Sequence, residues 1–147
     1  MPTRNASATW EGGIQKGKGS FKGESGAIGA PYSFGARFGE EKGTNPEELL
    51  AAAEAACFSM ALSGNLERAG ATPTRIETRA ACTVEKHGAG FKITTMKLVV
   101  RATASNIDDA KFQEVAQATK AGCPVSVALA GVQIDIEAAL ERQTAGV

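Results

Sequence analysis

The residues best suited to chemistry are the three cysteines, Cys57, Cys82 and Cys123, and each lies in a different local pattern. Cys123 stands between Gly122 and Pro124 at the start of a predicted helix, where unpaired N–H groups and the helix dipole stabilise a thiolate. Capping, packing and reactivity all stay open for it. Cys57 lies in mid-helix among apolar residues, where burial raises the pKa of a thiol and favours a core role. Cys82 falls on the apolar face of a predicted strand, and we expect it to be inert core.

Several kinds of site are excluded by the number of available ligands and bases. The cysteines are odd in number and form no CxxC pair, whereas a structural zinc site needs four ligands and a secreted disulfide framework an even set. The single histidine, His87, lies in a Gly-rich turn between two predicted strands. Ser-His-Asp and Cys-His catalysis are therefore left without a base. Two glycine-rich segments, at residues 12–19 and 17–23, partly match the motifs of nucleotide-binding loops. They lack the complete motif and the strand–turn–helix setting that such loops require.

The strongest predicted element is a helix that carries Cys57. Asn45 is its expected N-cap, Pro46 its first residue, and Glu47 favours the positive end of the helix dipole. Residues 49–62 are apolar nearly all round, which is typical of a helix buried in a large core or against another subunit. A chain of 147 residues cannot easily surround such a helix, so the pattern gives a first indication of a dimer.

The other predicted elements are mainly strands. Residues 6–22 predict two paired strands, and residues 23–44 predict either a loop or short strand pieces. From residue 74, apolar and polar residues alternate, as in a β-strand. The alternation shifts by one residue near residues 94–95, which indicates a β-bulge. Two helices precede a last strand. The first runs from residue 108 to Gly122, with Phe112, Val115, Ala116 and Thr119 facing inward, and the second covers residues 124–130. Strands interrupted by helices without a regular alternation predict an α+β fold, and we expect residues 1–147 to form a single domain.

Composition narrows the class of protein further. Sixteen basic residues balance sixteen acidic ones, and 43% of residues are hydrophobic. The balanced charge gives no net electrostatic field that would attract nucleic acid or an anionic membrane. The hydrophobic content together with the low net charge is not typical of a disordered chain. We expect no membrane-spanning run of about 20 apolar residues and no secretory signal at the N-terminus. The sequence thus predicts a cytoplasmic protein that binds neither nucleic acid nor membrane.

Two cysteine motifs resemble those of a known family. Residues 43–50 (GTNPEELL) followed by 55–62 (AACFSMAL), together with 121–126 (AGCPVS), are similar to the signatures of the osmotically inducible protein C family, OsmC, with its organic hydroperoxide resistance relatives, Ohr. The similarity extends over essentially the whole chain and includes residues 8–12 (ATWEG). The segment 31–34 (PYSF) resembles the OsmC branch more than the Ohr branch.

This resemblance implies an activity and a set of residues. Members are thiol peroxidases that reduce organic hydroperoxides and hydrogen peroxide in stress defence. By motif position, Cys57 is implied to be the peroxidatic cysteine, Cys123 the resolving cysteine that forms a disulfide with it, and Glu47 the catalytic glutamate. Arg37 is the best match for the catalytic arginine. No metal or bound cofactor is implied, and the expected reductant is an external thiol, in relatives a lipoyl dithiol.

The resemblance also implies a fold and leaves other functions open. The expected architecture is α+β, with antiparallel sheets wrapped around a long buried central helix in an intertwined homodimer. An apolar pocket lined by Phe58 and Met60 would suit an alkyl hydroperoxide. The alternatives are a different cysteine reaction, such as thioester hydrolysis, and a redox-sensing or structural stress protein without turnover.

The spacing of two of these residues adds an argument of its own. Glu47 and Cys57 are ten residues apart, so on one helix they are separated by about 15 Å along the axis and roughly 80° around it. Glu47 therefore cannot act directly on the Cys57 of its own helix. We expect an obligate dimer with the site at the interface, unless the arginine bridges a long gap.

Overall fold

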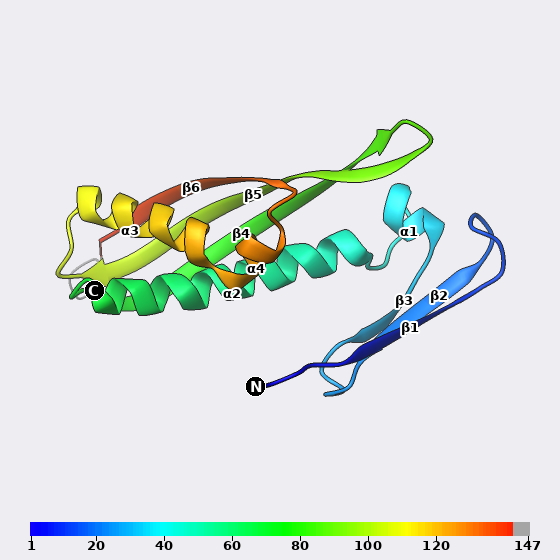
Figure 1. The fold of residues 1–147 in the computed structure, drawn as a ribbon, viewed down its shortest axis with the longest axis horizontal. Coiled ribbons are helices and arrows are strands. Elements are labelled where there is room, and N and C mark those ends of the chain that lie inside the picture. The colour runs from blue at the N-terminus through cyan, green and yellow to red at the C-terminus, as the bar shows by residue number, and fades with distance from the viewer. Residues whose placement is uncertain (143–147) are drawn as a thin grey trace. The chain divides into compact units, whose positions relative to one another are not determined.

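A computed structural model describes residues 1–142 of the chain. These residues belong to two compact units, Met1–Leu49 and Leu50–Val147, and Figure 1 shows the elements of each as a ribbon. The longest run of regular structure, helix α2 (Pro46–Arg68), begins in the first unit and continues into the second. The expectation of a single domain over residues 1–147 stays a prediction.

The first unit is a three-stranded antiparallel sheet followed by a short helix. Its strands β1 (Ala6–Glu11), β2 (Lys18–Gly23) and β3 (Gly29–Tyr32) pair in the order β1-β2-β3. Gly19 lies opposite both Trp10 and Tyr32 in this register. A Cβ at this glycine would lie only 2.5 Å from a ring atom of Tyr32 and 2.7 Å from one of Trp10. The missing side chain lets the two rings approach to 5.5 Å between centroids.

Helix α1 (Phe34–Phe38) follows β3, and the sequence did not predict it. The Ser33 side chain starts the helix, because its Oγ accepts a hydrogen bond from the Ala36 N–H at 3.1 Å. Five residues are too few to show a helical period. The predicted alternative of strand pieces was correct only for β3.

The second unit contains a three-stranded sheet with one parallel pair. Strands β4 (Thr72–His87) and β5 (Gly90–Ser105) form an antiparallel hairpin, whereas β6 (Gln133–Glu141) pairs with β5 in parallel. The expectation of purely antiparallel sheets is therefore wrong for this unit. The physical reason is the connection: α3 (Asp109–Gly122) and α4 (Pro124–Ala128) carry the chain back before β6 starts, and a crossover of this length brings the next strand in parallel.

The predicted bulge is present in the β4–β5 hairpin. Thr83 pairs with Thr95 and Val84 pairs with Ile93, so Thr94 is the extra residue on β5. Because of the bulge, the apolar side chains of β5 change from odd-numbered to even-numbered positions, as the shift in the sequence pattern indicated.

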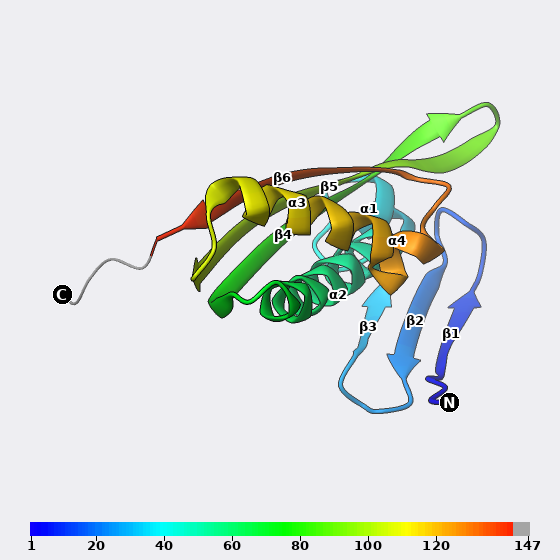
Figure 2. The same ribbon diagram turned by 60° about the vertical axis from the view of Figure 1, so that its left-hand side comes forward.

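The hydrophobic core of the second unit lies between one face of the sheet and the helices. Figures 1 and 2 show α2 and α3 on the same side of β4, β5 and β6. The core combines residues of α2, β5 and α3 that are buried: Phe58, Leu62, Leu66, Met96, Leu98, Val100, Ala102, Phe112, Val115 and Ala116. The inward face predicted for α3 is thus confirmed.

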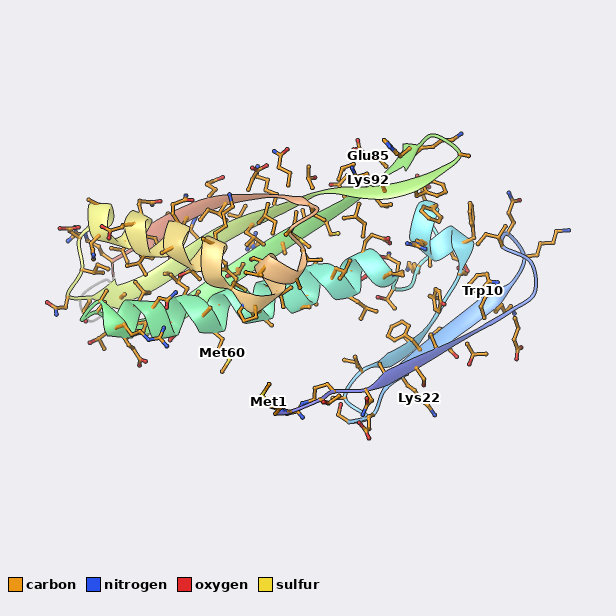
Figure 3. The ribbon with its side chains drawn as sticks, viewed as in Figure 1. Met1, Trp10, Lys22, Met60, Glu85 and Lys92 are labelled. Carbon is orange, nitrogen blue, oxygen red and sulfur yellow. The ribbon has the colours of Figure 1, made fainter. Side chains whose placement is uncertain are left out.

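Helix α2 begins as predicted and buries only part of its surface within one chain. Asn45 Oδ1 accepts a hydrogen bond from the Glu48 N–H at 2.9 Å, which caps the helix. Phe58, Leu62 and Leu66 are fully buried. Met60, in contrast, is 82% exposed and points away from the sheet in Figure 3. The described residues of one chain therefore do not provide the all-round burial that the apolar sequence calls for.

The same helix corrects the expectation that no run could span a membrane. By length and mean hydropathy α2 is long and apolar enough to do so. A core helix of a soluble protein satisfies the same criterion, and α2 packs three large side chains into the core of the second unit.

Candidate active site

Two of the three cysteines lie in contact. The Sγ atoms of Cys57, on α2, and Cys123, at the junction of α3 and α4, are 3.0 Å apart, with the Cys123 thiol donating a hydrogen bond to Cys57. Cys123 is buried, and Cys57 is partly exposed. A disulfide requires about 2.05 Å between sulfur atoms, so a shift of about 1 Å would join them.

Of the roles left open for Cys123, capping is not the one that its side chain performs. Within residues 1–142 its sulfur makes no capping hydrogen bond to α4, and Pro124, the first residue of α4, has no N–H to offer. The backbone of Cys123 ends α3 instead, because its N–H donates to the Thr119 carbonyl at 2.8 Å. The side chain is thereby left to contact Cys57.

The surroundings of Cys57 favour its neutral thiol. Burial raises the pKa of Cys57 above the ordinary value, and the hydrogen bond between the two thiols and the negative charge of Glu54 raise it further. A hydrogen bond from the backbone of Val125 opposes these effects. A reactive thiolate at this position therefore needs a nearby cation.

A second pair of predicted residues, Arg37 and Glu47, forms a forked salt bridge in the first unit. Arg37 Nη2 lies 2.7 Å from Glu47 Oε1, and Arg37 Nε lies 3.2 Å from each carboxylate oxygen. Glu47 is only 4% exposed. Arg37 also lies over the Phe38 ring, 5.0 Å from its centroid. The carboxylate and the ring together fix the plane of the guanidinium.

The Arg37 side chain borders a small aromatic cavity in the first unit. This cavity has a volume of about 190 Å³ and is lined by Arg37, Ser33, Ile14 and four aromatic residues: Trp10, Tyr32, Phe34 and Phe38. An apolar group of a few carbon atoms would fit such a space, with the guanidinium beside it.

The structure thus brings the four candidate residues together in two contacting pairs, one in each unit. Glu47 and Cys57 both lie on α2, ten residues apart, as predicted. Phe58 cannot line a substrate pocket, because it is fully buried in the core. Cys82 lies on β4, opposite Met96, among residues that pack against the core. Within residues 1–142, no group of three or more His, Cys, Asp or Glu side chains could hold a metal ion.

Two polar residues beside the cysteines were missed by the sequence analysis. Glu54 is fully buried, and its Oε1 accepts a short hydrogen bond from the Ser126 hydroxyl. Glu54 precedes Cys57 by three residues, and Ser126 follows Cys123 by three. The only signal in the sequence was the charged residue that interrupts an apolar helix.

Comparison with known proteins identifies the family. The family model described as OsmC-like protein matches residues 39–137. The peroxiredoxin OsmC of Escherichia coli K12 is 50% identical over 127 residues, which cover 86% of this chain and 89% of that protein. The organic hydroperoxide resistance protein OhrB of Bacillus subtilis is 35% identical over 106 residues, covering 69% of this chain and 72% of OhrB.

Solved structures agree with this result. The crystal structure of Bacillus subtilis OhrB has a TM-score of 0.66 at 30% identity and covers 92% of this chain and 98% of its own. An organic hydroperoxide resistance protein from Elizabethkingia anophelis has a TM-score of 0.73, covers 96% of this chain and 98% of its own, and at 23% identity shows the fold alone. The chain belongs to the OsmC-like family.

Proposed function

We propose that this protein is a thiol-dependent peroxidase that reduces organic hydroperoxides and hydrogen peroxide in stress defence. The observation that carries the proposal is the 3.0 Å contact between Cys57 Sγ and Cys123 Sγ. Two thiols held this close, on elements 66 residues apart in sequence, are suited to reversible disulfide formation. The names of the relatives, a peroxiredoxin and organic hydroperoxide resistance proteins, support the same activity.

The proposed cycle has three steps. The Cys57 thiolate attacks one peroxide oxygen, the O–O bond breaks, and the departing alkoxide takes a proton and leaves as an alcohol, or as water when the substrate is hydrogen peroxide. Cys57 is left as a sulfenic acid. The Cys123 thiol attacks the sulfenic sulfur, and its proton leaves with the hydroxyl group as water. An external dithiol then reduces the Cys57–Cys123 disulfide and restores both thiols.

Arg37 supplies the cation that this cycle needs. A guanidinium beside Cys57 would lower the pKa of the thiol against the effect of burial and would stabilise the negative charge that develops on the leaving oxygen. Glu47 holds the guanidinium through the forked salt bridge, with Nη2 at 2.7 Å. Cys57, Cys123, Arg37 and Glu47 are therefore the proposed catalytic set.

The site is proposed to form at the interface of a homodimer. Glu47 and Cys57 are ten residues apart on α2, about 15 Å along the helix axis, so the Arg37–Glu47 pair is proposed to act on Cys57 of the other subunit. The exposed side of α2, on which Met60 is 82% exposed, supports a partner at this helix.

The substrates and the compartment follow from the same features. The aromatic cavity of about 190 Å³ beside Arg37 supports an alkyl or aryl hydroperoxide as the preferred substrate. The reductant is proposed to be an external dithiol of the lipoyl type, with no metal or bound organic cofactor. A cytoplasmic location agrees with this requirement, since a reducing compartment keeps both thiols available.

A count of thiols after oxidation tests the proposal. One equivalent of cumene hydroperoxide is added to the reduced protein, which is then alkylated and mapped as peptides without reduction. The expected product is a Cys57–Cys123 disulfide with Cys82 alkylated, and Cys57→Ser is expected to abolish it. Turnover with excess dihydrolipoamide separates a peroxidase from a redox sensor, which would oxidise once and stop. Survival of all three thiols would overturn the proposal.

A further inference from the structure

Glu54 is a buried acid that the proposed cycle does not use. The side chain is fully buried, and its Oε2 has no hydrogen-bond partner within residues 1–142. Its Oε1 accepts the hydrogen bond from the Ser126 hydroxyl. A buried carboxyl group with incomplete hydrogen bonding costs free energy, and an apolar residue would serve the core better at this position. A functional reason for the acid is therefore expected.

The position of Glu54 relates it to the cysteine pair. Residues three apart lie on the same side of a helix, so Glu54 and Cys57 share one side of α2. On α4, Ser126 follows Cys123 by three residues in the same way. The two elements therefore meet at two successive contacts, Glu54 with Ser126 and Cys57 with Cys123. The effect of the Glu54 charge on Cys57 is consistent with this proximity.

Helix α4 needs such an anchor because it is short. It contains five residues, and its first residue is Pro124, which donates no backbone hydrogen bond. Isolated helical segments of this length are unstable and depend on tertiary contacts. Ser126, which is 5% exposed, provides one of these contacts from the middle of the helix.

We propose that Glu54 is a positioning residue for the resolving step. By binding the Ser126 hydroxyl, Glu54 holds α4 against α2, so that Cys123 Sγ stays within reach of Cys57 while the disulfide forms. In this step the Cys123–Cys57 S–S bond replaces the S–O bond of the sulfenic acid, and the hydroxyl group leaves as water with the Cys123 proton. The inference rests on the proposed function and adds a residue that governs its second step.

The proposal predicts which step slows when the anchor is lost. Glu54→Ala and Ser126→Ala are expected to slow disulfide formation on the order of tenfold, the effect of losing one hydrogen bond to a charged group. The first step, loss of the Cys57 thiol on mixing with peroxide, is expected to stay within about threefold in Ser126→Ala, which keeps the Glu54 side chain. Glu54→Ala also removes a charge that raises the pKa of Cys57, so its first step is expected to be unchanged or faster, not slower. Excess peroxide should then convert more Cys57 to sulfinic acid, since the sulfenic acid persists.

A single-turnover experiment measures both steps. Reduced protein is mixed with cumene hydroperoxide, quenched at intervals by acid and alkylation, and analysed by peptide mass spectrometry for thiol, disulfide and sulfinic acid. Glu54→Gln is the conservative variant: its amide oxygen still accepts from Ser126, so it should resolve within about threefold of wild type. Glu67→Gln is the matched control, an exposed glutamate on the same helix.

The outcomes separate this inference from the proposed function. If wild type forms no Cys57–Cys123 disulfide, the proposed function fails before any variant is compared. If wild type forms it and folded Ser126→Ala forms it at the wild-type rate, the positioning role of Glu54 is overturned. Ser126→Ala decides the matter even where Glu54→Ala does not fold. Slow resolution in both alanine variants, no slower in the double variant than in the slower single one, and recovery in Glu54→Gln would support the role.

Discussion

At the scale of single residues, the candidate site consists of polar side chains held in fixed geometry by partners that are themselves buried. The guanidinium of Arg37 contacts both oxygens of a carboxylate that is 4% exposed. Cys123 is 1% exposed and places its sulfur against Cys57. Such an arrangement would lower the reorganisation needed in the proposed cycle, because the members of each pair are already in contact. It also makes each partner's shape important, not only its charge.

Arg37→Lys tests the importance of shape. A lysine keeps the positive charge but has a single ammonium group, which cannot reproduce contacts from both Nε and Nη2 to Glu47. We expect kcat/KM for cumene hydroperoxide to fall on the order of tenfold or more, the loss of about 1.4 kcal/mol of transition-state stabilisation. The control is Arg101→Lys, because the Arg101 side chain is equally exposed, at 35%, and pairs with Glu137 on the second unit's sheet. Equal activity of the two variants would contradict a role for the forked geometry.

The pH dependence of Cys57 tests the cation. Because burial, Cys123 and Glu54 raise the pKa of Cys57, less thiolate is present at any given pH, and reactivity increases only as the pH rises. If Arg37 offsets this effect, Arg37→Ala should move the pH profile of Cys57 alkylation to higher pH, with slower alkylation at pH 7. Peptide-resolved mass spectrometry after short exposure to iodoacetamide measures the profile. Superimposable profiles for wild type and Arg37→Ala would show that Arg37 does not act on this thiol.

At the scale of elements, α2 contributes to both the core and the site. Its Phe58, Leu62 and Leu66 are fully buried against β5 and α3, while Glu47, Glu54 and Cys57 carry the polar groups. The core contacts therefore fix the rotation of the helix about its axis, and this rotation decides where the Cys57 sulfur lies. Stability and activity are linked through one element.

Leu62→Ala is expected to weaken this support. Removing a fully buried leucine side chain costs about 2–5 kcal/mol, from lost burial and the cavity left behind. The free energy of unfolding should fall by that amount in a urea titration followed by circular dichroism. Glu67→Ala, at an exposed position near the end of the same helix, should change it by less than about 0.5 kcal/mol. Similar values for the two variants would mean that α2 is not anchored through Leu62.

The sequence predicted those elements whose signals are local. The Asn45 cap, the inward face of α3 and the bulge at Thr94 each depend on residues close in the chain, and each was confirmed. The parallel pairing of β6 was missed, because strand direction depends on the path of the whole connection. Helix α1 was missed because five residues are too few to show the helical repeat of apolar positions.

The residues of the candidate site likewise differ in whether a local sequence signal reveals them. Cys57, Cys123 and Glu47 lie in motifs that the sequence displays, so they could be named in advance. Glu54 was missed, because a lone glutamate in an apolar helix resembles a polar interruption. Its partner, Ser126, is 72 residues away, and only the fold brings the two together.

At the scale of the whole molecule, the proposed cycle requires the two pairs of candidate residues to meet. Each pair lies within one compact unit, Arg37–Glu47 in the first and Cys57–Cys123 in the second. The ten-residue separation of Glu47 and Cys57 along α2 argues for a site that takes one pair from each subunit. A symmetric dimer would then contain two such sites, each with contributions from both chains.

Mixing two inactive variants tests this arrangement. Arg37→Ala and Cys57→Ser are each expected to be inactive alone. After the two are denatured, mixed in equal amounts and refolded, about half of the dimers should contain one chain of each kind. If arginine and cysteine come from different subunits, one of the two sites in each mixed dimer regains both residues, so about one quarter of wild-type activity should return. Peroxidase assays on the refolded mixture, with each variant refolded alone as control, measure this recovery. Without recovery, and with a dimer verified by sedimentation, each site must draw its arginine and cysteine from one chain.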